Sequence, residues 1–192
     1  MLKTLSLVAA FVGCAAILSA QAVTADADTY KVNYFANANT SSAPDGTVYI
    51  TDVGTSSPNG GNLCADIFVF DPSQELTECC GCKLTPDGLR TLSVNTNLTA
   101  NPLTGVILTT GVIKVLSATV VSGGCPMPTA PKVSPGLRAW GTHIQNANFA
   151  ITETDFQDAG LSAAELARLG SECSAIVEVG SGKGRCSCGS GD

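Results

Sequence analysis

Apolar and polar positions alternate with a period of two through much of the chain, a pattern that predicts short β-strands. Residues 30–34 alternate in this way, and residues 67–70 are continuously apolar, as in a central strand covered on both faces. The pattern predicts further strands at residues 47–53, 89–94, 106–108, 112–121, 137–144 and 149–152. Seven or eight short strands separated by turns predict a mainly β fold, a single-domain antiparallel β-sandwich of Ig-like or jelly-roll-like type.

A turn at residues 71–74, with proline at its second position, follows the strand predicted at 65–70. If the chain reverses there, residues whose numbers sum to about 145 face each other across a hairpin. This register places Cys64 near the run from Cys80 to Cys82. Residues 122–135 contain four prolines, which a central strand does not tolerate, so this segment is predicted to cross the fold in an extended form.

Helix signals occur only in the C-terminal third of the chain. Ser162 and Glu165 have the spacing of a capping box, in which the serine accepts from the Glu165 amide and the glutamate reaches back to the Ser162 amide. Apolar residues then recur at helical spacing, which predicts one helix at about residues 162–177 with Cys173 on its buried face. Residues 180–192 have the composition of a flexible, Gly-rich tail that only Cys186 and Cys188 tether.

Residues 1–22 are typical of a secretory signal peptide. They comprise a basic start at Lys3, an apolar run, and a small-x-small cleavage site at residues 20–22. A membrane anchor is the alternative, but the run of about 16 residues is shorter than the roughly 20 that a spanning helix needs. Cys14 also stands in a loose lipid-attachment sequence. The domain organisation is therefore a signal peptide at 1–22, a β-sandwich at 23–179 that includes the helix, and the tail at 180–192.

Cleavage after residue 22 turns nine cysteines into eight, because it removes Cys14. An even set in an exported chain predicts structural disulfides. They involve Cys64, Cys79, Cys80, Cys82, Cys125, Cys173, Cys186 and Cys188. The preferred pairs are Cys173 with Cys186 or Cys188, and Cys64 with Cys80 or Cys82, with Cys125 taking a remaining partner.

The cysteine clusters also allow a thiolate metal site for zinc or Cu(I). Its ligands would be Cys79, Cys80, Cys82, Cys186 and Cys188. Cys79 and Cys82 have the spacing of a structural zinc site, whereas Cys186 and Cys188 miss it by one residue. Asp66 and four other aspartates near turns are interpreted as solvated carboxylates rather than calcium ligands. We therefore expect no metal and no cofactor in the oxidised chain.

Charge and histidine content narrow the function classes. Ten basic and sixteen acidic residues give a formal net charge of −6, which argues against a nucleic-acid partner. His143 is the single histidine, and no motif supplies it with a nucleophile and an orienting acid. We therefore expect no catalytic residues and no enzyme activity. Trp140 is interpreted as a packing residue, although an exposed indole can stack on a sugar.

Several motifs resemble a group of uncharacterised exported bacterial proteins rich in cysteine. They are the NLCA sequence at residues 62–65, the VFD sequence at 69–71, ECCGC at 78–82 and TPDGL at 85–89. Residues 136–140, GLRAW, belong to the same pattern, and the resemblance spans about residues 48–188. It implies a secreted bacterial protein and implies no activity, ligand or catalytic residue.

These observations predict an exported, disulfide-stapled structural, adhesive or binding module in the extracellular space, periplasm or cell envelope. The alternative is an extracytoplasmic metal-binding protein that uses the cysteine clusters, and the third hypothesis is a secreted hydrolase. No second hydrophobic span follows the signal peptide, so a transmembrane segment in the mature chain is not expected. The partner itself is not specified by the sequence, and a protein or a cell surface is expected.

Overall fold

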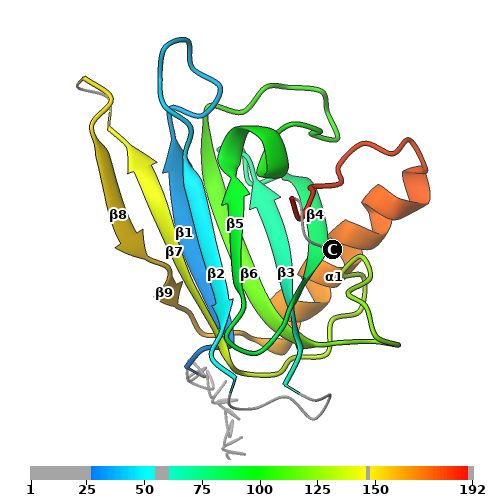
Figure 1. Ribbon diagram of the computed structural model, residues 1–192. Coiled ribbons are helices and arrows are strands. Elements are labelled where there is room, and N and C mark those ends of the chain that lie inside the picture. The colour runs from blue at the N-terminus through cyan, green and yellow to red at the C-terminus, as the bar shows by residue number, and fades with distance from the viewer. Residues whose placement is uncertain (1–26, 55–60, 146–147, 190–192) are drawn as a thin grey trace, which may run out of the picture.

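The structure is a computed structural model that describes residues 27–54, 61–145 and 148–189. The signal peptide predicted at 1–22 lies outside the described residues. Two antiparallel sheets face each other (Figure 1). The five-stranded sheet has the order β4 (Leu76–Leu84), β3 (Leu63–Phe70), β6 (Thr110–Thr119), β1 (Tyr30–Ala36) and β9 (Gln157–Asp158). The four-stranded sheet has the order β5 (Leu89–Ser93), β2 (Thr47–Asp52), β7 (Leu137–Ile144) and β8 (Ile151–Asp155).

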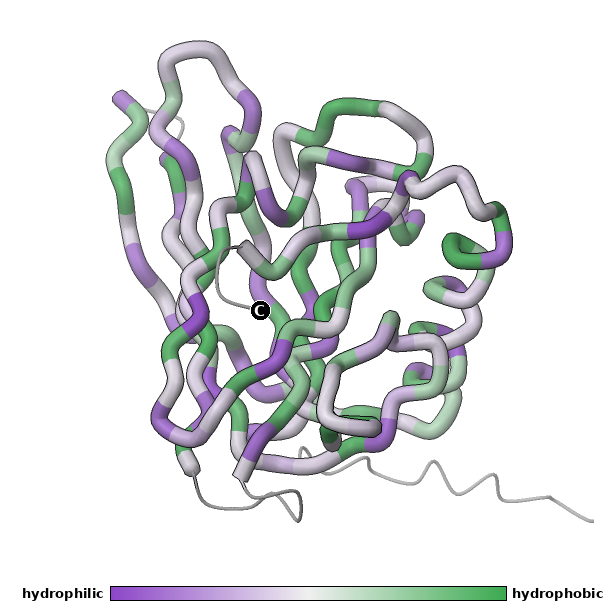
Figure 2. The backbone as a smooth tube through the Cα atoms, turned by 45° about the vertical axis from the view of Figure 1, so that its right-hand side comes forward, coloured by the Kyte–Doolittle hydropathy of each residue, from purple (hydrophilic) through white to green (hydrophobic). Residues whose placement is uncertain are grey.

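The core lies between the two sheets and follows from the alternation of each strand. On β3, Ala65, Ile67 and Val69 point inward and pack with residues of the opposite sheet such as Ile50 and Leu92. Hydrophobic and hydrophilic segments accordingly alternate along the strands (Figure 2). The predicted mainly β, antiparallel sandwich with one C-terminal helix is confirmed.

Helix α1 (Ala163–Val179) covers the outer face of the five-stranded sheet, as Figure 1 shows. Its buried residues Leu169, Cys173 and Ile176 pack with residues of the sheet that include Phe68 and Leu116. An isolated helix of this length is only marginally stable in water, so packing of this apolar face against the sheet stabilises α1. The helix ends at Gly180, whose φ of 67° is the left-handed conformation that glycine adopts readily.

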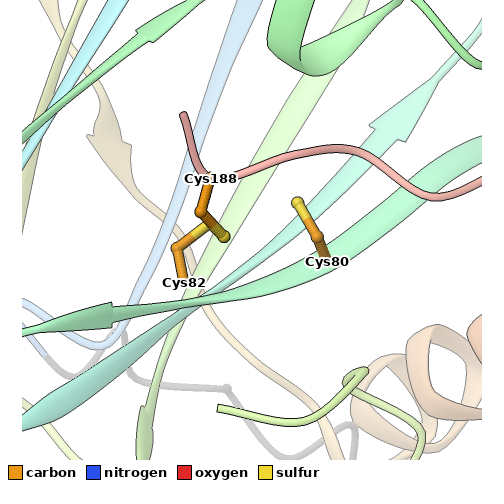
Figure 3. A group of neighbouring side chains, drawn as sticks. All are labelled: Cys80, Cys82 and Cys188. Carbon is orange, nitrogen blue, oxygen red and sulfur yellow. A yellow bond between two sulfur atoms is a disulfide. The ribbon is translucent and has the colours of Figure 1, made fainter. Parts of the chain in front are cut away.

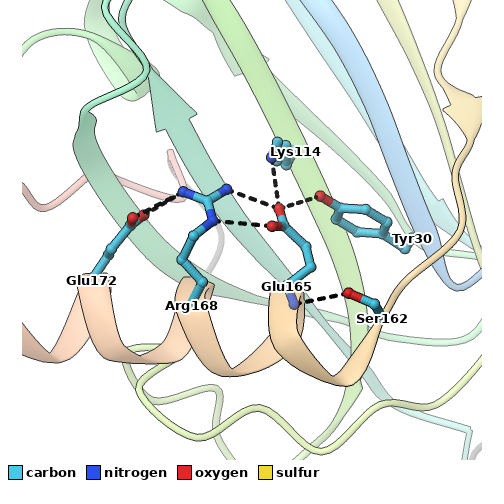
Figure 4. A network of polar contacts seen from close by, with 6 residues as sticks. All are labelled: Tyr30, Lys114, Ser162, Glu165, Arg168 and Glu172. Carbon is cyan, nitrogen blue, oxygen red and sulfur yellow. Dashed lines mark hydrogen bonds and ion pairs between the residues drawn. The ribbon is translucent and has the colours of Figure 1, made fainter. Parts of the chain in front are cut away.

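The predicted capping box is only half formed. Ser162 Oγ accepts a hydrogen bond from the Glu165 amide at 3.0 Å, as expected. The Glu165 carboxylate, however, turns to the sheet, where it accepts from the Tyr30 hydroxyl at 3.1 Å and from Lys114 at 2.7 Å. Arg168 binds the same carboxylate with two nitrogens, at 2.9 and 3.0 Å (Figure 4). The two cations offer charge-assisted bonds that are stronger than a bond from the backbone amide.

This network perturbs the acidity of Glu165. Burial by itself would raise the pKa, but the hydrogen bonds and charges of Arg168 and Lys114 outweigh burial and lower the pKa to about 2. A carboxyl whose pKa is lower in the folded than in the unfolded chain stabilises the fold above its ordinary pKa near 4.5. That contribution is lost as the pH falls from there towards 2.

We expect Glu165→Gln to lower the free energy of unfolding at pH 7 by about 1–2 kcal/mol, since it leaves Lys114 and Arg168 without their shared carboxylate. The difference from wild type should shrink between pH 4.5 and pH 2. Urea titrations of both proteins at several pH values measure this difference in the free energy of unfolding. Glu172→Gln is the matched control, because Glu172 contacts only Arg168 in this network and its loss should matter less. A difference that does not change with pH would contradict the assigned role.

Three local expectations are corrected. Residues 106–108 form no strand, and Val106 and Ile107 are 61% and 71% exposed, because their β-branched run has no neighbouring strand to pair with. The strand predicted at 149–152 is instead β8, Ile151–Asp155, paired with β7. The strand predicted at 89–94 is β5, which ends at Ser93, because a π-helical turn, η1 (Val94–Leu98), begins at the next residue. The Ser93 side chain caps this turn by accepting a hydrogen bond from the Thr96 amide.

The segment at 122–135, named the crossing here, forms no central strand, as its prolines predicted. It contacts β6 through an isolated bridge between Ala118 and Val133, and a second isolated bridge, between Val121 and Gly124, closes a local turn at its start. Among the helices that the structure describes, none is both long and apolar enough to cross a membrane.

Candidate functional site around the cysteine-rich strand

Strand β4 carries the cluster Glu78-Cys79-Cys80-Gly81-Cys82 at the edge of the five-stranded sheet. Successive side chains of a strand point to opposite faces. Cys79 therefore points outward to the cluster beneath α1, whereas Cys80 and Cys82 point inward to the core between the sheets. One strand thus presents cysteines to both layers that flank its sheet.

All eight cysteines of the described chain form disulfides. Cys79–Cys173 ties β4 to α1, and Cys64–Cys125 ties β3 to the crossing. The other two, the tail disulfides, are Cys80–Cys186 and Cys82–Cys188, which tie β4 to the C-terminal tail. The Cα–Cα distances, 5.3–6.0 Å, lie in the range that unforced disulfides require.

The preferred pairings of the sequence analysis are wrong, although the eight cysteines are the expected ones. Cys173 pairs with Cys79 and not with Cys186 or Cys188. The hairpin register sums to 147, as in Ile67 opposite Cys80 and Ala65 opposite Cys82, so Cys64 lies opposite Lys83.

The physical reason for the second error is the strand alternation. Cys64 lies on the outer face, with Ala118, Val120 and Cys125, whereas Cys80 and Cys82 lie on the inner face. Proximity in register therefore does not bring Cys64 to either sulfur.

The tail lies between the two edge strands β4 and β5. The Cys79 amide donates to Gly184 O at 2.9 Å, and the Cys186 amide donates to Cys79 O at 3.3 Å. On the other side, Arg90 of β5 donates to Cys188 O at 3.0 Å. The tail is thus held by hydrogen bonds as well as by its cysteines, which corrects the expectation that only disulfides tether it. It also covers part of an edge strand that would otherwise expose unpaired backbone groups.

Glu78 is a buried carboxyl beneath this tail that sequence reasoning missed. Its Oε1 accepts from the Asn101 amide at 2.9 Å, while Oε2 has no partner among the described residues. Asn101 in turn binds the tail, donating to Gly182 O at 2.8 Å and to Arg185 O at 3.2 Å. Burial raises the pKa of Glu78 to about 7, although the Asn101 amide and Lys183 act in the opposite direction.

The metal alternative can be compared with this geometry. The sulfurs of Cys80, Cys82 and Cys188 lie within 4.8 Å of one another, and Figure 3 shows the three side chains side by side. All three sulfurs are in disulfides, as are those of Cys79 and Cys186. A thiolate metal site needs deprotonated thiols, so the oxidised chain offers this cluster no thiolate ligand.

His143 lies on β7 with 2% of its surface exposed. Its Nε2 lies 2.6 Å from Thr154 Oγ1, its ring stacks on Tyr34 with 4.1 Å between centroids, and burial lowers its pKa. Nδ1 has no partner among the described residues, so none of them supplies an acid that orients the ring.

Two of the five aspartates that the sequence analysis interpreted as solvated, Asp52 and Asp66, are buried instead, and Asp52 is 1% exposed. Asp66 lies within β3, opposite Gly81, and is 4% exposed rather than solvated at a turn. The signal that predicts this was present, because position 66 belongs to the central strand that is covered on both faces.

Comparisons with protein-family models, with curated proteins and with solved structures find no match to this chain.

Proposed function

We propose that the chain acts outside the cytoplasm as a disulfide-stabilised structural or adhesive module without catalytic activity. The observation that carries this proposal is the set of four disulfides, three of which start from one strand and fasten the helix and the tail. Disulfides persist in oxidising compartments and are rare in the cytosol. The signal-peptide pattern of residues 1–22 and the resemblance to exported bacterial proteins favour the same location.

The lack of catalytic activity is proposed on the site chemistry. His143 is buried, burial lowers its pKa, and Thr154 is its hydrogen-bond partner, while within the described ranges no acid contacts the other ring nitrogen. A hydrolase of the serine type needs that acid to hold the imidazole in the reactive tautomer. The arrangement therefore supports a packing role for the imidazole rather than a hydrolase.

Extracytoplasmic metal binding is the second candidate, favoured by the three clustered sulfurs of Cys80, Cys82 and Cys188. In this case the tail disulfides would be open, and reduction by an external dithiol would release four thiols in one place. Zinc or Cu(I) would then bind the thiolates.

One purification separates these candidates. The full-length chain is expressed, and the extracytoplasmic fraction is analysed by intact mass, alkylation of free thiols without reduction, and metal content. We expect a chain cleaved after Ala22, no alkylated cysteine and no stoichiometric metal. A cytoplasmic, fully alkylated chain would overturn the extracytoplasmic proposal. Free thiols together with zinc or copper would favour the metal-binding candidate.

Adhesion is tested with the same oxidised protein immobilised on beads. Retention of cells or envelope fragments of the source organism above the level of reduced, alkylated protein supports an adhesive module. Equal retention by both forms would contradict it, because only the folded surface is expected to bind.

A further inference from the structure

The two sheets differ in how their outer faces are covered. The crossing and α1 lie over the five-stranded sheet (Figure 1). On the four-stranded sheet, Ile50 of β2 and Ala139 of β7 belong to the core, so the neighbouring Tyr49 and Trp140 point outward. Both are half-buried, and no residue that points outward on β2, β5, β7 or β8 is buried. The single tryptophan therefore lies outside the core, contrary to its interpretation as a packing residue.

The strand register brings outward side chains of all four strands into one row. Tyr49 lies opposite Thr91 of β5 on one side and opposite Trp140 of β7 on the other. Trp140 in turn lies opposite Asp155 of the edge strand β8. Directly opposite residues have their Cβ atoms about 4.5–5.5 Å apart, so the two aromatic side chains stand side by side. The row crosses three strand spacings, about 14 Å in all.

The polar groups of this row are unused. Within the described part of the chain, no residue forms a hydrogen bond or an ion pair with the Tyr49 hydroxyl, the Trp140 indole N–H or the Asp155 carboxylate. The indole only donates, the carboxylate only accepts, and the phenol hydroxyl does both. The row therefore presents two aromatic rings together with a donor, an acceptor and a hydroxyl that are available to a ligand.

A pocket of about 280 Å³ lies beside the row, where β8 passes into β9. Trp140 and Asp155 line it together with Gln157, whose side chain donates to Asp155 O at 3.2 Å. Pockets for drug-sized molecules measure about 300–1,000 Å³, so this one suits a single small polar unit. The row and the pocket share Trp140 and Asp155, and one ligand can therefore occupy both.

The charges of the pocket disfavour an acidic ligand. Its two cations already have carboxylate partners: Lys31 Nζ lies 2.7 Å from Asp158 Oδ1, and Arg138 Nε lies 3.2 Å from Asp28 Oδ1. The carboxylate of Asp155 has no cationic partner among the described residues. An anionic ligand would therefore be repelled by Asp155 and would find no unpaired cation among the residues that line the pocket.

We propose that this outer face binds a neutral β-1,4-linked glucan, with sugar rings over Tyr49 and Trp140 and an end unit in the pocket beside Asp155. The inference rests on the proposed function, because it names what the adhesive module holds. In such a glucan the ring substituents are equatorial, so each sugar presents a flat face of C–H groups to an aromatic ring and hydroxyls at its edge. The extended chain matches the row that crosses the sheet.

A protein partner fits this face less well. The centre of a protein interface is apolar and depleted of charged residues. Here the two rings are bordered by Thr91 and Asp155, and the exposed aliphatic side chains of the sheet, Leu89 and Ile151, lie outside the row. A polyhydroxy ligand satisfies both the rings and the polar groups beside them.

Titration of the oxidised protein from the extracytoplasmic fraction tests the proposal. The probes are cellohexaose, which is neutral, and hexagalacturonic acid, which has the same length and is acidic. We expect cellohexaose to bind at millimolar concentrations or below by calorimetry, and the acidic hexamer at least tenfold more weakly. Failure of cellohexaose to bind, or equal or tighter binding of the acidic hexamer, would overturn the proposal.

Tyr49→Ala removes one of the two rings, and we expect it to weaken cellohexaose binding at least tenfold. Tyr34→Ala is the matched control, because it is the same substitution at a tyrosine of the other sheet that is 52% exposed. Affinity that is unchanged in Tyr49→Ala, or that falls equally in both variants, would contradict the site.

Quenching of Trp140 fluorescence by acrylamide gives a readout on the unmutated protein, which does not depend on how a variant folds. Saturating cellohexaose should cover the indole and lower the quenching constant by about twofold or more. Because Trp140 is the single tryptophan, the signal reports on this site alone. A quenching constant that cellohexaose leaves unchanged would exclude Trp140 from the site.

Competition on the protein-coated beads separates this inference from the proposed function. Cells or envelope fragments that stay bound in the presence of free cellohexaose, together with no cellohexaose binding in solution, would leave the module adhesive and exclude the glucan site. Cellohexaose binding in solution without any retention on the beads would support the glucan site and contradict the adhesive function. Release of the retained material by cellohexaose is the result that we expect.

Discussion

Removal of both tail disulfides by alanine substitution is expected to lower the free energy of unfolding by about 5 kcal/mol, whereas removal of either one should lower it by only about 2 kcal/mol. The two bonds, Cys80–Cys186 and Cys82–Cys188, both join β4 to the tail, and their cysteines are two residues apart in β4 and two residues apart in the tail. Once one of them is closed, the second closes a ring of only about six residues, and short rings restrict the unfolded chain little.

Whichever tail disulfide closes first stabilises the fold more than the second, because it closes a longer loop. With Cys79–Cys173 intact, the path between the two ends runs through that bond and encloses about 20 residues, for which loop closure predicts about 3 kcal/mol. Either tail disulfide can make this closure, so each compensates for loss of the other. The combined loss should therefore exceed the sum of the single losses.

Urea unfolding followed through Trp140 fluorescence measures these values, because Trp140 is the single tryptophan of the chain. The three variants needed are Cys80→Ala with Cys186→Ala, Cys82→Ala with Cys188→Ala, and all four substitutions together. Each pair removes one disulfide and similar side-chain volume. Strictly additive losses would mean that the two bonds do not close the same loop, and would contradict the arrangement of the tail between β4 and β5.

The layered β architecture was accessible from the sequence because period-two patterns and turn residues act locally. Strand β7 was predicted with the bounds that the structure has, and α1 lies within two residues of its predicted ends. The strand predicted at 106–108 is absent because pairing is not local: β-branched residues form a strand only where a neighbouring strand is available.

The disulfide connectivity was not accessible from hairpin proximity alone, because it depends on which face each cysteine occupies. Alternation along β4 separates Cys79 from Cys80 and Cys82, and the last two share their two-residue spacing with Cys186 and Cys188. Two extended segments lying side by side would match these spacings. The equal spacing of the two cysteine pairs therefore indicated their connectivity. The partner of Cys79, in contrast, depends on where α1 lies over the sheet, and long-range packing determines that position.

The burial of Asp66 shows a different limit. Its position on a covered strand can be predicted from the pattern, but the segment that covers it cannot, because the crossing comes from residues about 60 positions away in the chain. Only the fold shows that the crossing and Asp66 line one cavity, which Lys132 lines as well.

Gly81→Ala is expected to lower the free energy of unfolding by about 2–3 kcal/mol, a large effect for one added methyl group. The new Cβ would lie 2.4 Å from Pro126 O, and a backbone carbonyl has little freedom to move away. Gly124→Ala is the matched control in the crossing, because nothing lies within 4 Å of its Cβ position and its φ is not in the left-handed region. Chemical denaturation of both variants should therefore separate the clash from the general effect of replacing glycine.

The clash should depend on the disulfide that fastens the crossing to β3. In a background with Cys64→Ala and Cys125→Ala, the crossing is free to move away from β4, so Gly81→Ala should lose less than about 1 kcal/mol there, because alanine is also favoured over glycine in a strand. The difference between the two backgrounds, a coupling of about 2 kcal/mol, measures how firmly Cys64–Cys125 holds the crossing against the sheet. The same cost in both backgrounds would show that the other contacts of the crossing hold it in place. In that case the cavity between Asp66 and the crossing would keep its shape without the disulfide.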